Sequence, residues 1–425
     1  MQSEISIQRL KQFPPLMWIL LFGSFITRGS FYMVWPFLAV ILYEKFGLSA
    51  TEVGLILSGS AVVSVVTTFI GSALSDKFGR HLMMYGTGIL YIISFALLAE
   101  ANTIMSFIVV ISLCSIATAL WRPLTSALIG DIIKDSQTRE LAMQAMYFIV
   151  NVGCAIGPIA GVFLGLTGEQ SSFYITTYAF VLLLGLLFIG FRGQKRLEVA
   201  DSTRNINNAN VESSAGHASP DTSFKTTLSV LKQDKMFQCL ILANVLCMFI
   251  YAQMDSSLVQ YLTRAKVPNL LELISSIIFT NAIVIISCQF LLLKLMAKQS
   301  LVTRVKIGLL LLAASQFWIA FNPLTLFWGF IGATVVMSLA EAILFPTMNV
   351  HIDRIAPSHL RGAYFGAASI YDFGYALAPL GGGIILDLFG GFWLYIFVGV
   401  LTFGVIYLYH ILETLPRPRF IAVKN

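Results

Sequence analysis

The sequence predicts an all-α membrane protein with twelve transmembrane helices, arranged as two pseudo-symmetric bundles of six. Three observations lead to this fold class. The chain of 425 residues is 57% hydrophobic and only 11% charged, whereas soluble domains carry about 25% charged residues. Its apolar runs are about twenty residues long, which is the length of helix that crosses a bilayer. Sequence markers in the first half also recur, in the same order, in the second half.

The apolar runs carry few or no charges and fall into two sets of six. The first set covers residues 14–43, 52–74, 82–99, 103–133, 141–166 and 173–191. The second set covers residues 236–263, 271–297, 305–321, 324–352, 363–388 and 392–412. Between them the chain is polar and rich in Asn, Ser and Ala, a composition typical of a disordered linker. We therefore expect an N-terminal bundle in 1–191, a cytoplasmic linker in 192–235 and a C-terminal bundle in 236–425.

Internal repetition supports the division into two halves. Three markers recur at offsets of 223, 222 and 221 residues, namely Pro123 with Pro346, Arg139 with Arg361, and Pro158 with Pro379. Parallel repeats related by an axis along the membrane normal are an architecture of transporters.

The basic residues indicate how the chain is oriented. One set of loops, together with both terminal segments and the linker, holds most of the Lys and Arg, whereas the opposite set holds Lys45, Arg264 and Lys266. Because cytoplasmic loops are enriched in Lys and Arg, we expect a multi-pass protein of the cytoplasmic (inner) membrane with both termini in the cytoplasm. The net charge of +6 then reflects orientation, and we expect no nucleic-acid partner.

The first apolar run and the five cysteines indicate neither a cleaved signal peptide nor a disulfide or metal site. The first apolar run begins at Phe13, contains Arg28 and Pro36, and lacks a small-residue cleavage site beyond it, so we expect this helix to stay in the membrane. All five cysteines fall inside predicted spans without a C-x-x-C pair, a pattern that suggests neither disulfides nor a zinc site. We expect no metal and no cofactor.

The loop after the second span reads SALSDKFGRH and contains Asp76, Lys77, Gly79 and Arg80. It resembles the signature loop of the major facilitator superfamily, G-x-L-x-D-R/K-x-G-R/K-R/K. Gly79 permits a tight turn, and Arg80 can bridge to a neighbouring acid. The alternative is a charged turn that obeys the positive-inside rule.

The match departs from the pattern at two positions, with Ser72 at the first Gly and His81 at the last basic residue. The resemblance implies that the loop latches one conformation of the transporter. It also implies that an acid on the fourth helix joins the loop's arginine in a charge relay, which makes Asp131 the candidate partner of Arg80 and Asp76.

The fifth span contains Gly153, Gly157, Pro158 and Gly161. Glycines spaced by four let helices approach closely, and a proline weakens the helix at one point. The pattern resembles the helix-5 motif that is enriched in the antiporter branches of the superfamily. Ordinary packing of small residues is the alternative.

The whole chain is most similar to the drug/proton antiporter branch of the superfamily. The resemblance rests on three segments: RGSFYMVWP at 28–36, the run from Pro123 to Asp131, and SLAEAILFP around Glu341, where Ala340 replaces the usual Gly. The resemblance implies a major facilitator fold that works as a monomer. It also implies alternating access driven by the proton gradient, with protons, a small-molecule substrate and the lipid bilayer as partners.

Five of the ionisable residues inside predicted spans stand out, because a charge deep in the membrane costs at least ~2.5 kcal/mol. They are Arg28, Arg122, Asp255, Glu341 and Asp372. Four of them lie on spans 1, 4, 7 and 10, which line the central cavity in the family that the chain resembles. Two cations against three carboxylates leave one acid without a fixed cationic partner.

The hypothesis for these residues assigns a role to each. Asp255 and Glu341 carry the proton, with Asp372 as a secondary acid. Arg28 and Arg122 tune the acids or bind anionic groups of the substrate. The repeat offset places Arg122 opposite a position within one helical turn of Glu341, so the two side chains could meet. The alternatives are a structural Glu–Arg pair at Glu341, a solvated Asp255 near the outer mouth, and a packing pair at Asp372.

Aromatic residues stand beside these charges and could build an apolar, cation-tolerant pocket for substrate. They are Tyr32, Trp35, Trp121, Tyr251 and Phe345. Generic packing is the alternative for each of them.

Other function classes find less support in the sequence. It contains no G-x-x-x-x-G-K-[ST] loop for ATP, and neither G-x-S-x-G nor H-E-x-x-H, so we expect no enzyme, and a membrane-embedded sensor is disfavoured. The leading hypothesis is proton-coupled export of drugs or metabolites. Two arginines among the cavity residues favour the alternative, a proton-coupled importer or uniporter of one anionic or zwitterionic metabolite, peptide or siderophore.

Overall fold

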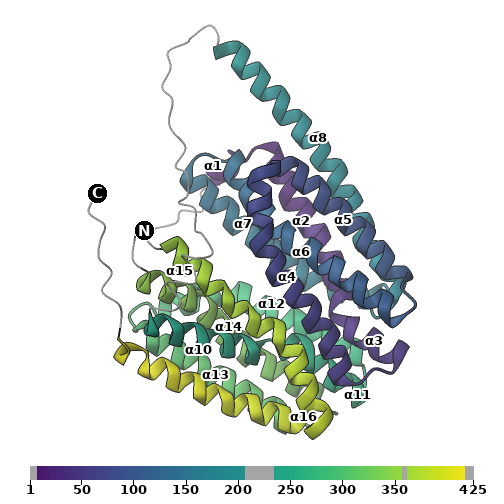
Figure 1. Ribbon diagram of the computed structural model, residues 1–425, viewed down its shortest axis with the longest axis vertical. Coiled ribbons are helices and arrows are strands. Elements are labelled where there is room, and N and C mark those ends of the chain that lie inside the picture. The colour runs from purple at the N-terminus through teal and green to yellow at the C-terminus, as the bar shows by residue number, and fades with distance from the viewer. Residues whose placement is uncertain (1–6, 206–233, 357–360, 417–425) are drawn as a thin grey trace. The chain divides into compact units, whose positions relative to one another are not determined.

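The computed structural model of the chain describes residues 7–205, 234–356 and 361–416 (Figure 1). Within these ranges the side chains of 7–8, 69–78, 136, 194–205, 290, 293, 361–363 and 413 lie outside the description. The described chain consists of helices and the turns between them, without a β-strand. The predicted all-α fold class is therefore confirmed.

The first six membrane passages, which correspond to the first six predicted spans, and the segment before them contain eight α-helices. The first passage combines α2 (Pro15–Val34), a 3₁₀ turn at Trp35–Phe37 and α3 (Leu38–Phe46). Pro36 lies in that turn, where it lacks the N–H that a continuous α-helix would use. The other helices are α1 (Ile7–Leu10), α4 (Ala50–Phe78), α5 (Arg80–Glu100), α6 (Ile104–Ile132), α7 (Ser136–Phe163) and α8 (Phe173–Asn205).

Helix α8 extends beyond the predicted span. The composition of residues 192–205 predicted the start of a disordered linker, but the helix continues to Asn205. The stretch QKRLEVA at 194–200 explains the continuation, because most of these residue types have high helix propensity. Residues 206–233 of the predicted linker lie outside the described residues.

The second set of passages begins with α10 (Lys235–Tyr251), a π turn at Met254–Leu258 and α11 (Val259–Arg264). Then follow α12 (Leu270–Leu295), α13 (Leu301–Phe321), α14 (Phe327–Ile355), α15 (Arg361–Ala368), a 3₁₀ turn at Ser369–Tyr371, α16 (Asp372–Ile411) and a last 3₁₀ turn at Leu412–Thr414.

Eleven helices in the described ranges are long and apolar enough to cross a membrane. The last of them, Tyr364–Ile411, has 48 residues, or about 72 Å at the rise of an α-helix. That is more than twice the thickness of a hydrocarbon core, about 30 Å. Its backbone leaves the helical conformation at Gly390, with φ 82° and ψ 172°, which divides it into two passages. The predicted number of twelve follows.

The described chain separates into two compact units, and the second contains segments from both halves of the sequence. Unit 1 comprises Met1–Val34, Val66–Gly157 and Glu169–Ser219, and unit 2 comprises Trp35–Val65, Pro158–Gly168 and Pro220–Asn425. The predicted division into bundles at 1–191 and 236–425 stays a prediction.

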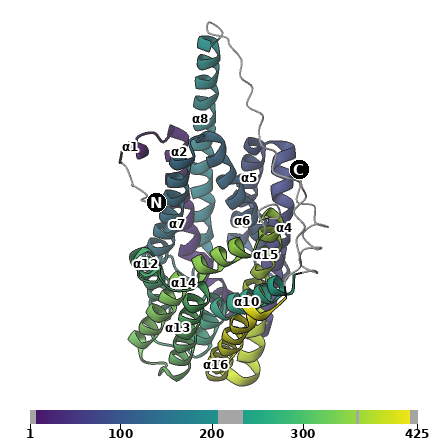
Figure 2. The same ribbon diagram turned by 90° about the vertical axis from the view of Figure 1, so that its left-hand side faces the viewer.

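Unit 1 has an aromatic core. Tyr91 on α5 stacks on Phe180 of α8 at 3.8 Å between ring centroids, and Trp121 of α6 packs edge-on against the same ring at 5.2 Å. In unit 2, α13 packs against α14 and α16, α10 packs against α16, and α12 packs against α14, as Figure 2 shows for the bundle around α10.

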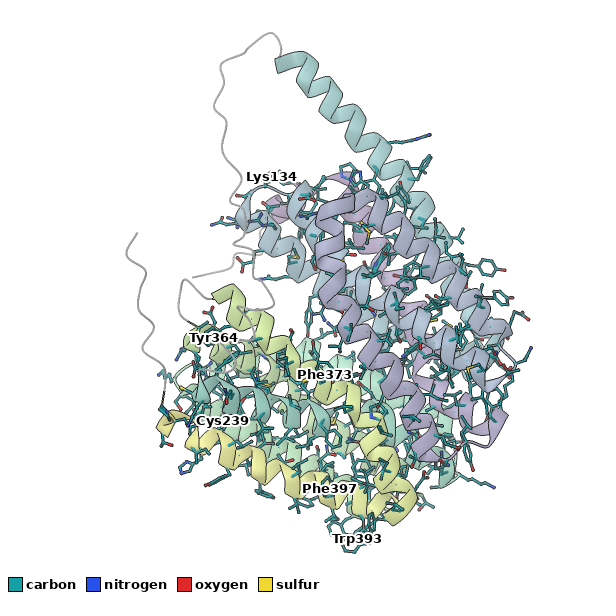
Figure 3. All side chains as sticks on the ribbon, viewed as in Figure 1. Lys134, Cys239, Tyr364, Phe373, Trp393 and Phe397 are labelled. Carbon is teal, nitrogen blue, oxygen red and sulfur yellow. The ribbon has the colours of Figure 1, made fainter. Side chains whose placement is uncertain are left out.

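Large apolar side chains also point away from the core. On α16 beyond the break, Trp393 and Phe397 are 57% and 48% exposed and stand outward from the bundle (Figure 3). A protein in water rarely leaves such a surface uncovered. An outward-facing apolar surface is what acyl chains require.

Candidate functional site

Three helices of unit 2 converge on the carboxylate of Glu341, which lies on α14. Its Oε2 accepts a hydrogen bond from the Tyr251 hydroxyl of α10 at 2.8 Å and another from Asn281 Nδ2 of α12 at 2.7 Å. Nδ2 of Asn281 also donates to Ser338 Oγ at 3.1 Å. Ser338 stands one turn before Glu341 on α14, so the amide is held at two points.

The groups of the described chain that donate hydrogen bonds to this carboxylate are uncharged. Tyr251 is 8% exposed, and its ring packs edge-on against Phe345, one turn after Glu341, at 4.9 Å. Both hydrogen bonds that Glu341 accepts within the described chain come from uncharged groups. Charge-assisted bonds to a carboxylate stabilise it without a cation. The alternative of a structural Glu–Arg pair at Glu341 stays a prediction.

Asp255 lies in the π turn of unit 2. The N–H of Leu258 donates to the carbonyl of Gln253 at 2.8 Å, five residues back. Such turns are rare and occur frequently at functional sites. The Asp255 carboxylate is exposed and accepts a hydrogen bond from the Tyr375 hydroxyl of α16 at 2.8 Å.

The two acids are related through α10. Tyr251, the donor to Glu341, precedes Asp255 by four residues, about one helical turn. Each acid thus receives a tyrosine hydroxyl, and the first tyrosine stands next to the second acid along the chain. Asp372 is the exposed first residue of α16, three residues before Tyr375, so the third predicted acid lies near this group in sequence.

The predicted cations lie in unit 1. Arg28 on α2 is half-buried, with its guanidinium carbon 5.9 Å from the ring of Phe31 and with Tyr32 and Tyr91 among its neighbours. Arg122 is exposed on α6. Its pairing with Glu341, which lies in unit 2, stays a prediction, as do the roles proposed for both arginines.

The predicted substrate aromatics occupy different settings. Trp121 is 6% exposed and belongs to the aromatic core of unit 1. Tyr32 packs edge-on against Phe31, and Trp35 lies half-buried in the 3₁₀ turn between α2 and α3. Tyr251 and Phe345 flank Glu341. These last two residues therefore lie beside an acid.

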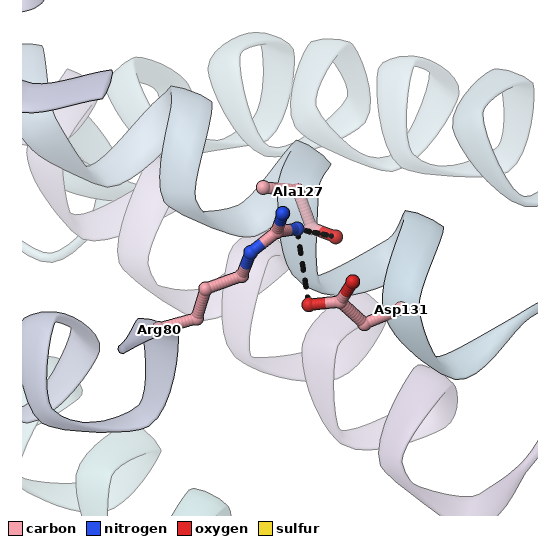
Figure 4. A network of polar contacts seen from close by, with 3 residues as sticks. All are labelled: Arg80, Ala127 and Asp131. Atoms are coloured by element: carbon pink, nitrogen blue, oxygen red, sulfur yellow. Dashed lines mark hydrogen bonds and ion pairs between the residues drawn. The ribbon is translucent and has the colours of Figure 1, made fainter. Parts of the chain in front are cut away.

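The signature loop brings Arg80 to Asp131 within unit 1 (Figure 4). Arg80 Nη1 lies 3.0 Å from Asp131 Oδ2 and donates to the carbonyl of Ala127 at 2.6 Å. Gly79 has φ 83°, a conformation that favours glycine, and it lets α5 begin directly after α4. The side chains of Asp76 and Lys77 lie outside the described residues. The role of the pair as a latch stays a prediction.

The glycines of the fifth span lie against the first. A Cβ built at Gly157 would stand 2.2 Å from the carbonyl oxygen of Gly29, and one at Gly153 would stand 2.9 Å from that of Phe25. Helices α7 and α2 therefore touch through their backbones. Pro158 is buried inside α7, and Gly161 accepts the N–H of Leu166 at 2.9 Å where that helix ends.

Sequence reasoning missed three residues at the acids, namely Asn281, Ser338 and Tyr375. Asn281 had a signal, because it is an amide in the apolar run IIFTNAIVII and a polar group in a span needs a partner. Ser338 and Tyr375 had none, since serines and tyrosines are common in membrane helices.

Residues 20–372 match the family model of the Major Facilitator Superfamily. The chain belongs to this superfamily. A major facilitator of Bacillus subtilis, the uncharacterized MFS-type transporter YqjV, is 27% identical over 387 residues, which cover 90% of this chain and 89% of that protein. A Na(+), Li(+), K(+)/H(+) antiporter of Planococcus maritimus is 26% identical over 415 residues, covering 92% and 94%.

Solved structures share the fold of this major facilitator. A POT family transporter in complex with 5-aminolevulinic acid aligns with a TM-score of 0.72 at 17% identity, covering 94% of this chain and 96% of that one. A point mutant of the nucleoside transporter NupG aligns with a TM-score of 0.76 at 11% identity, covering 93% and 98%. The chain is a multi-pass membrane transporter of the major facilitator type and not an enzyme.

Proposed function

We propose that this transporter couples the movement of a small organic solute to protons by alternating access, and that Glu341 is the proton site. The observation that supports this is the carboxylate at the meeting point of α10, α12 and α14, where both donors found among the described residues are uncharged. A carboxylate without a cation can take up and release a proton without breaking an ion pair. Such intramembrane acids mark proton relays.

Asp255 is the second acid in the proposal. Asp255 is exposed, whereas Glu341 is half-buried. Tyr251, the last residue of α10, donates to Glu341 and precedes Asp255 by four residues. A proton that reaches Asp255 therefore has hydroxyl and carboxylate groups ahead of it on the way to Glu341. Asp372 serves as a further acid on the exposed side.

The direction of transport has two candidates. Export in exchange for protons is supported by the glycine and proline pattern of α7 and by one relative, named as a cation/proton antiporter. Import of a zwitterionic or anionic solute is supported by Arg28 and Arg122, and by the fold shared with the POT transporters. The loop charges support an inner-membrane protein with both termini in the cytoplasm, and the family resemblance supports a monomer.

The test uses purified protein in liposomes loaded with a pH-sensitive dye. Ethidium, dialanine and NaCl, added separately, probe a cationic drug, a zwitterionic peptide and an alkali cation. We expect one of them to change the lumenal pH, and the sign of the change gives the direction. Each proton coupled to one solute supports up to about tenfold accumulation per unit of pH gradient, since one pH unit corresponds to about 1.4 kcal/mol.

Glu341→Gln is the deciding variant, because the amide keeps an oxygen to accept from Tyr251 and Asn281 but cannot carry a proton. We expect solute exchange to continue while accumulation driven by the pH gradient falls to about the equilibrium level. Glu272→Gln is the matched control, since Glu272 is an exposed acid in the first turn of α12. Accumulation by Glu341→Gln equal to that of the wild type contradicts the assignment.

A further inference from the structure

Polar side chains gather around two phenylalanines of α8 in unit 1, at the end of α5 and α8 that the loop charges predict to face the cytoplasm. The ring of His81, on the first turn of α5, lies against Phe191 with 4.0 Å between ring centroids. Tyr85, one turn later, packs edge-on against the same ring at 5.8 Å. The guanidinium carbon of Arg192 lies 4.1 Å from the centre of the Phe188 ring, and Tyr85 is an electrostatic neighbour of Arg192. An imidazole, a phenol hydroxyl and a guanidinium therefore share one surface.

These three polar groups have no acid beside them within the described part of the chain. His81, Tyr85 and Arg192 form no hydrogen bond or ion pair with another described residue, and His81 and Arg192 are exposed. A guanidinium that stacks on an aromatic ring keeps the N–H groups in its own plane available. Those groups match the oxygens of a phosphate in pairs. The surface thus offers positive charge and donors to an anion from outside the chain.

Unit 2 carries a second basic pair on α13 and α16. Lys306 on α13 places Nζ 3.2 Å from Nδ1 of His410, which lies near the end of α16. An ammonium group can only donate, so Nδ1 accepts and the N–H of the imidazole ring is at Nε2. The remaining hydrogens of Nζ and the Nε2–H are then two neighbouring donors, and neither is used within the described chain.

The two groups occupy equivalent positions of the internal repeat. Lys306 follows Tyr85 by 221 residues, and His410 follows Phe188 by 222, which are offsets found for the repeated prolines and arginines. The third and sixth passages pack together as α5 and α8, and the ninth and twelfth pack together as α13 and the end of α16. The residue types differ between the halves, while the placement of donors is the same. Equal placement with different side chains indicates a common ligand rather than a common packing contact.

An outward-facing apolar surface continues from each group along the same helices. Phe403, Tyr407 and His410 stand four and three residues apart on α16, so they share one face of the helix. Tyr85 shares a face of α5 with Leu82 and Ile89 in the same way. The exposed apolar residues nearest the two groups are Leu82, Ile89, Phe188, Ile189, Leu310, Phe403 and Tyr407. Because such a surface faces acyl chains, the basic groups at its edge lie where lipid headgroups lie.

We propose that each half binds the phosphate of an anionic glycerophospholipid at this edge. In unit 1 the phosphate accepts from Arg192, with Tyr85 and His81 beside it. In unit 2 it accepts from Lys306 and His410. The basic groups favour anionic over zwitterionic lipids because they attract the net negative charge, and the exposed apolar side chains contact the acyl chains. Lipid binding at these edges depends neither on proton coupling nor on the solute.

Native mass spectrometry of the purified protein counts the lipids that it retains. The protein is transferred into detergent micelles that contain equal amounts of phosphatidylglycerol and phosphatidylcholine. We expect the wild type to retain two molecules of phosphatidylglycerol, Arg192→Gln and Lys306→Gln to retain one each, and the double variant to retain none. Lys134→Gln and Lys298→Gln are the matched controls, since each removes the same charge from an exposed residue of unit 1 or unit 2. Both controls should retain two.

The affinity for phosphatidylglycerol provides a second measurement. Loss of the charge-assisted hydrogen bonds in Arg192→Gln or Lys306→Gln should weaken binding at that site about tenfold. His410→Phe keeps an aromatic ring but removes the donor, and it should weaken binding in unit 2 about fivefold. Lys306→Arg keeps the charge and should retain its lipid, so it separates loss of charge from damage to the fold if Lys306→Gln melts below its control. Arg192→Lys has the same purpose in unit 1.

Four results would overturn the proposal or part of it. Full retention by both Gln variants overturns both sites, and loss in only one variant overturns the site of the other half. Equal retention of phosphatidylcholine overturns the preference for an anionic lipid. Inorganic phosphate, added to the protein with bound phosphatidylglycerol, should leave the lipid in place, and displacement of the lipid would indicate a site for a free anion instead.

Discussion

Replacing Gly157 with alanine tests how tightly α7 lies on α2. The added Cβ would stand 2.2 Å from the carbonyl oxygen of Gly29 and 3.0 Å from its carbonyl carbon. Because Cβ atoms in proteins essentially never come closer than 3.0 Å to such an atom, one helix must shift by roughly 1 Å. The contact is with backbone, which cannot rotate aside as a side chain would. Insertion of a methyl group into such a site costs about 1 to 3 kcal/mol.

Thermal unfolding of the purified protein measures this cost. At the roughly 2 °C per kcal/mol that large domains show, Gly157→Ala should lower the melting temperature by about 2 to 6 °C. Gly130→Ala is the matched control within unit 1, because a Cβ at Gly130 meets nothing within 4 Å. It should melt as the wild type does or slightly higher, since alanine has the better helix propensity. Equal melting temperatures for the two variants would refute the close contact.

Two further predictions concern charges near the predicted cytoplasmic end. Arg80 and Asp131 are 30% and 48% exposed, so solvent screens the pair, and Asp131→Asn should cost only about 0.2 to 1 kcal/mol in unfolding free energy. If the pair is a latch, Asp131→Asn should reduce transport more than it reduces stability, and the double variant Arg80→Asp with Asp131→Arg should restore transport. A fall of several kcal/mol in the free energy of unfolding would instead indicate a structural pair. Hydrogen bonds from the Thr138 hydroxyl and N–H lower the pKa of the Asp135 carboxyl. Its stabilisation is therefore present above the unfolded pKa of about 3.9 and is lost as pH falls through the lower folded value. The melting difference between wild type and Asp135→Asn should be constant from pH 7 to 5 and shrink below about pH 4, and a constant difference to pH 3 would contradict this.

Features that depend on local sequence were predictable. Hydropathy alone predicts the passages, because a bilayer demands a long apolar run for each. The spacing of Gly153 and Gly157 predicts a close helix contact, and the structure has one at Gly29. The positive φ of Gly79 likewise follows from the short turn between two spans. In each case the physical constraint acts within one helix or one turn, so the sequence pattern carries it.

Features that depend on distant partners were not. Glu341 and Asp255 stand out as charges in apolar runs, but nothing near them in sequence names Asn281 or Tyr375 as donors. The π turn at Asp255 depends on one extra residue fitting into a helix, and helical hydrophobic periodicity does not register such an insertion. The pocket role of Trp121 stays a prediction, and the packing of its ring on Phe180 in the core of unit 1 is a contact that the neighbouring Arg122 does not indicate.

Asp387 shows why distance in sequence limits such reasoning. As an acid near the end of a predicted span it gives no sign of its role, and its partners at Ala50 and Thr51 lie 337 and 336 residues away. Asp387 reaches and caps the start of α4 because the backbones of α4 and α16 touch nearby, where Gly54 lies against Pro379 and Gly383 lies against Ala50. Close helix contacts are therefore the better guide to such caps. Where glycines bring two backbones together, the polar groups at the ends of those helices come within hydrogen-bond reach.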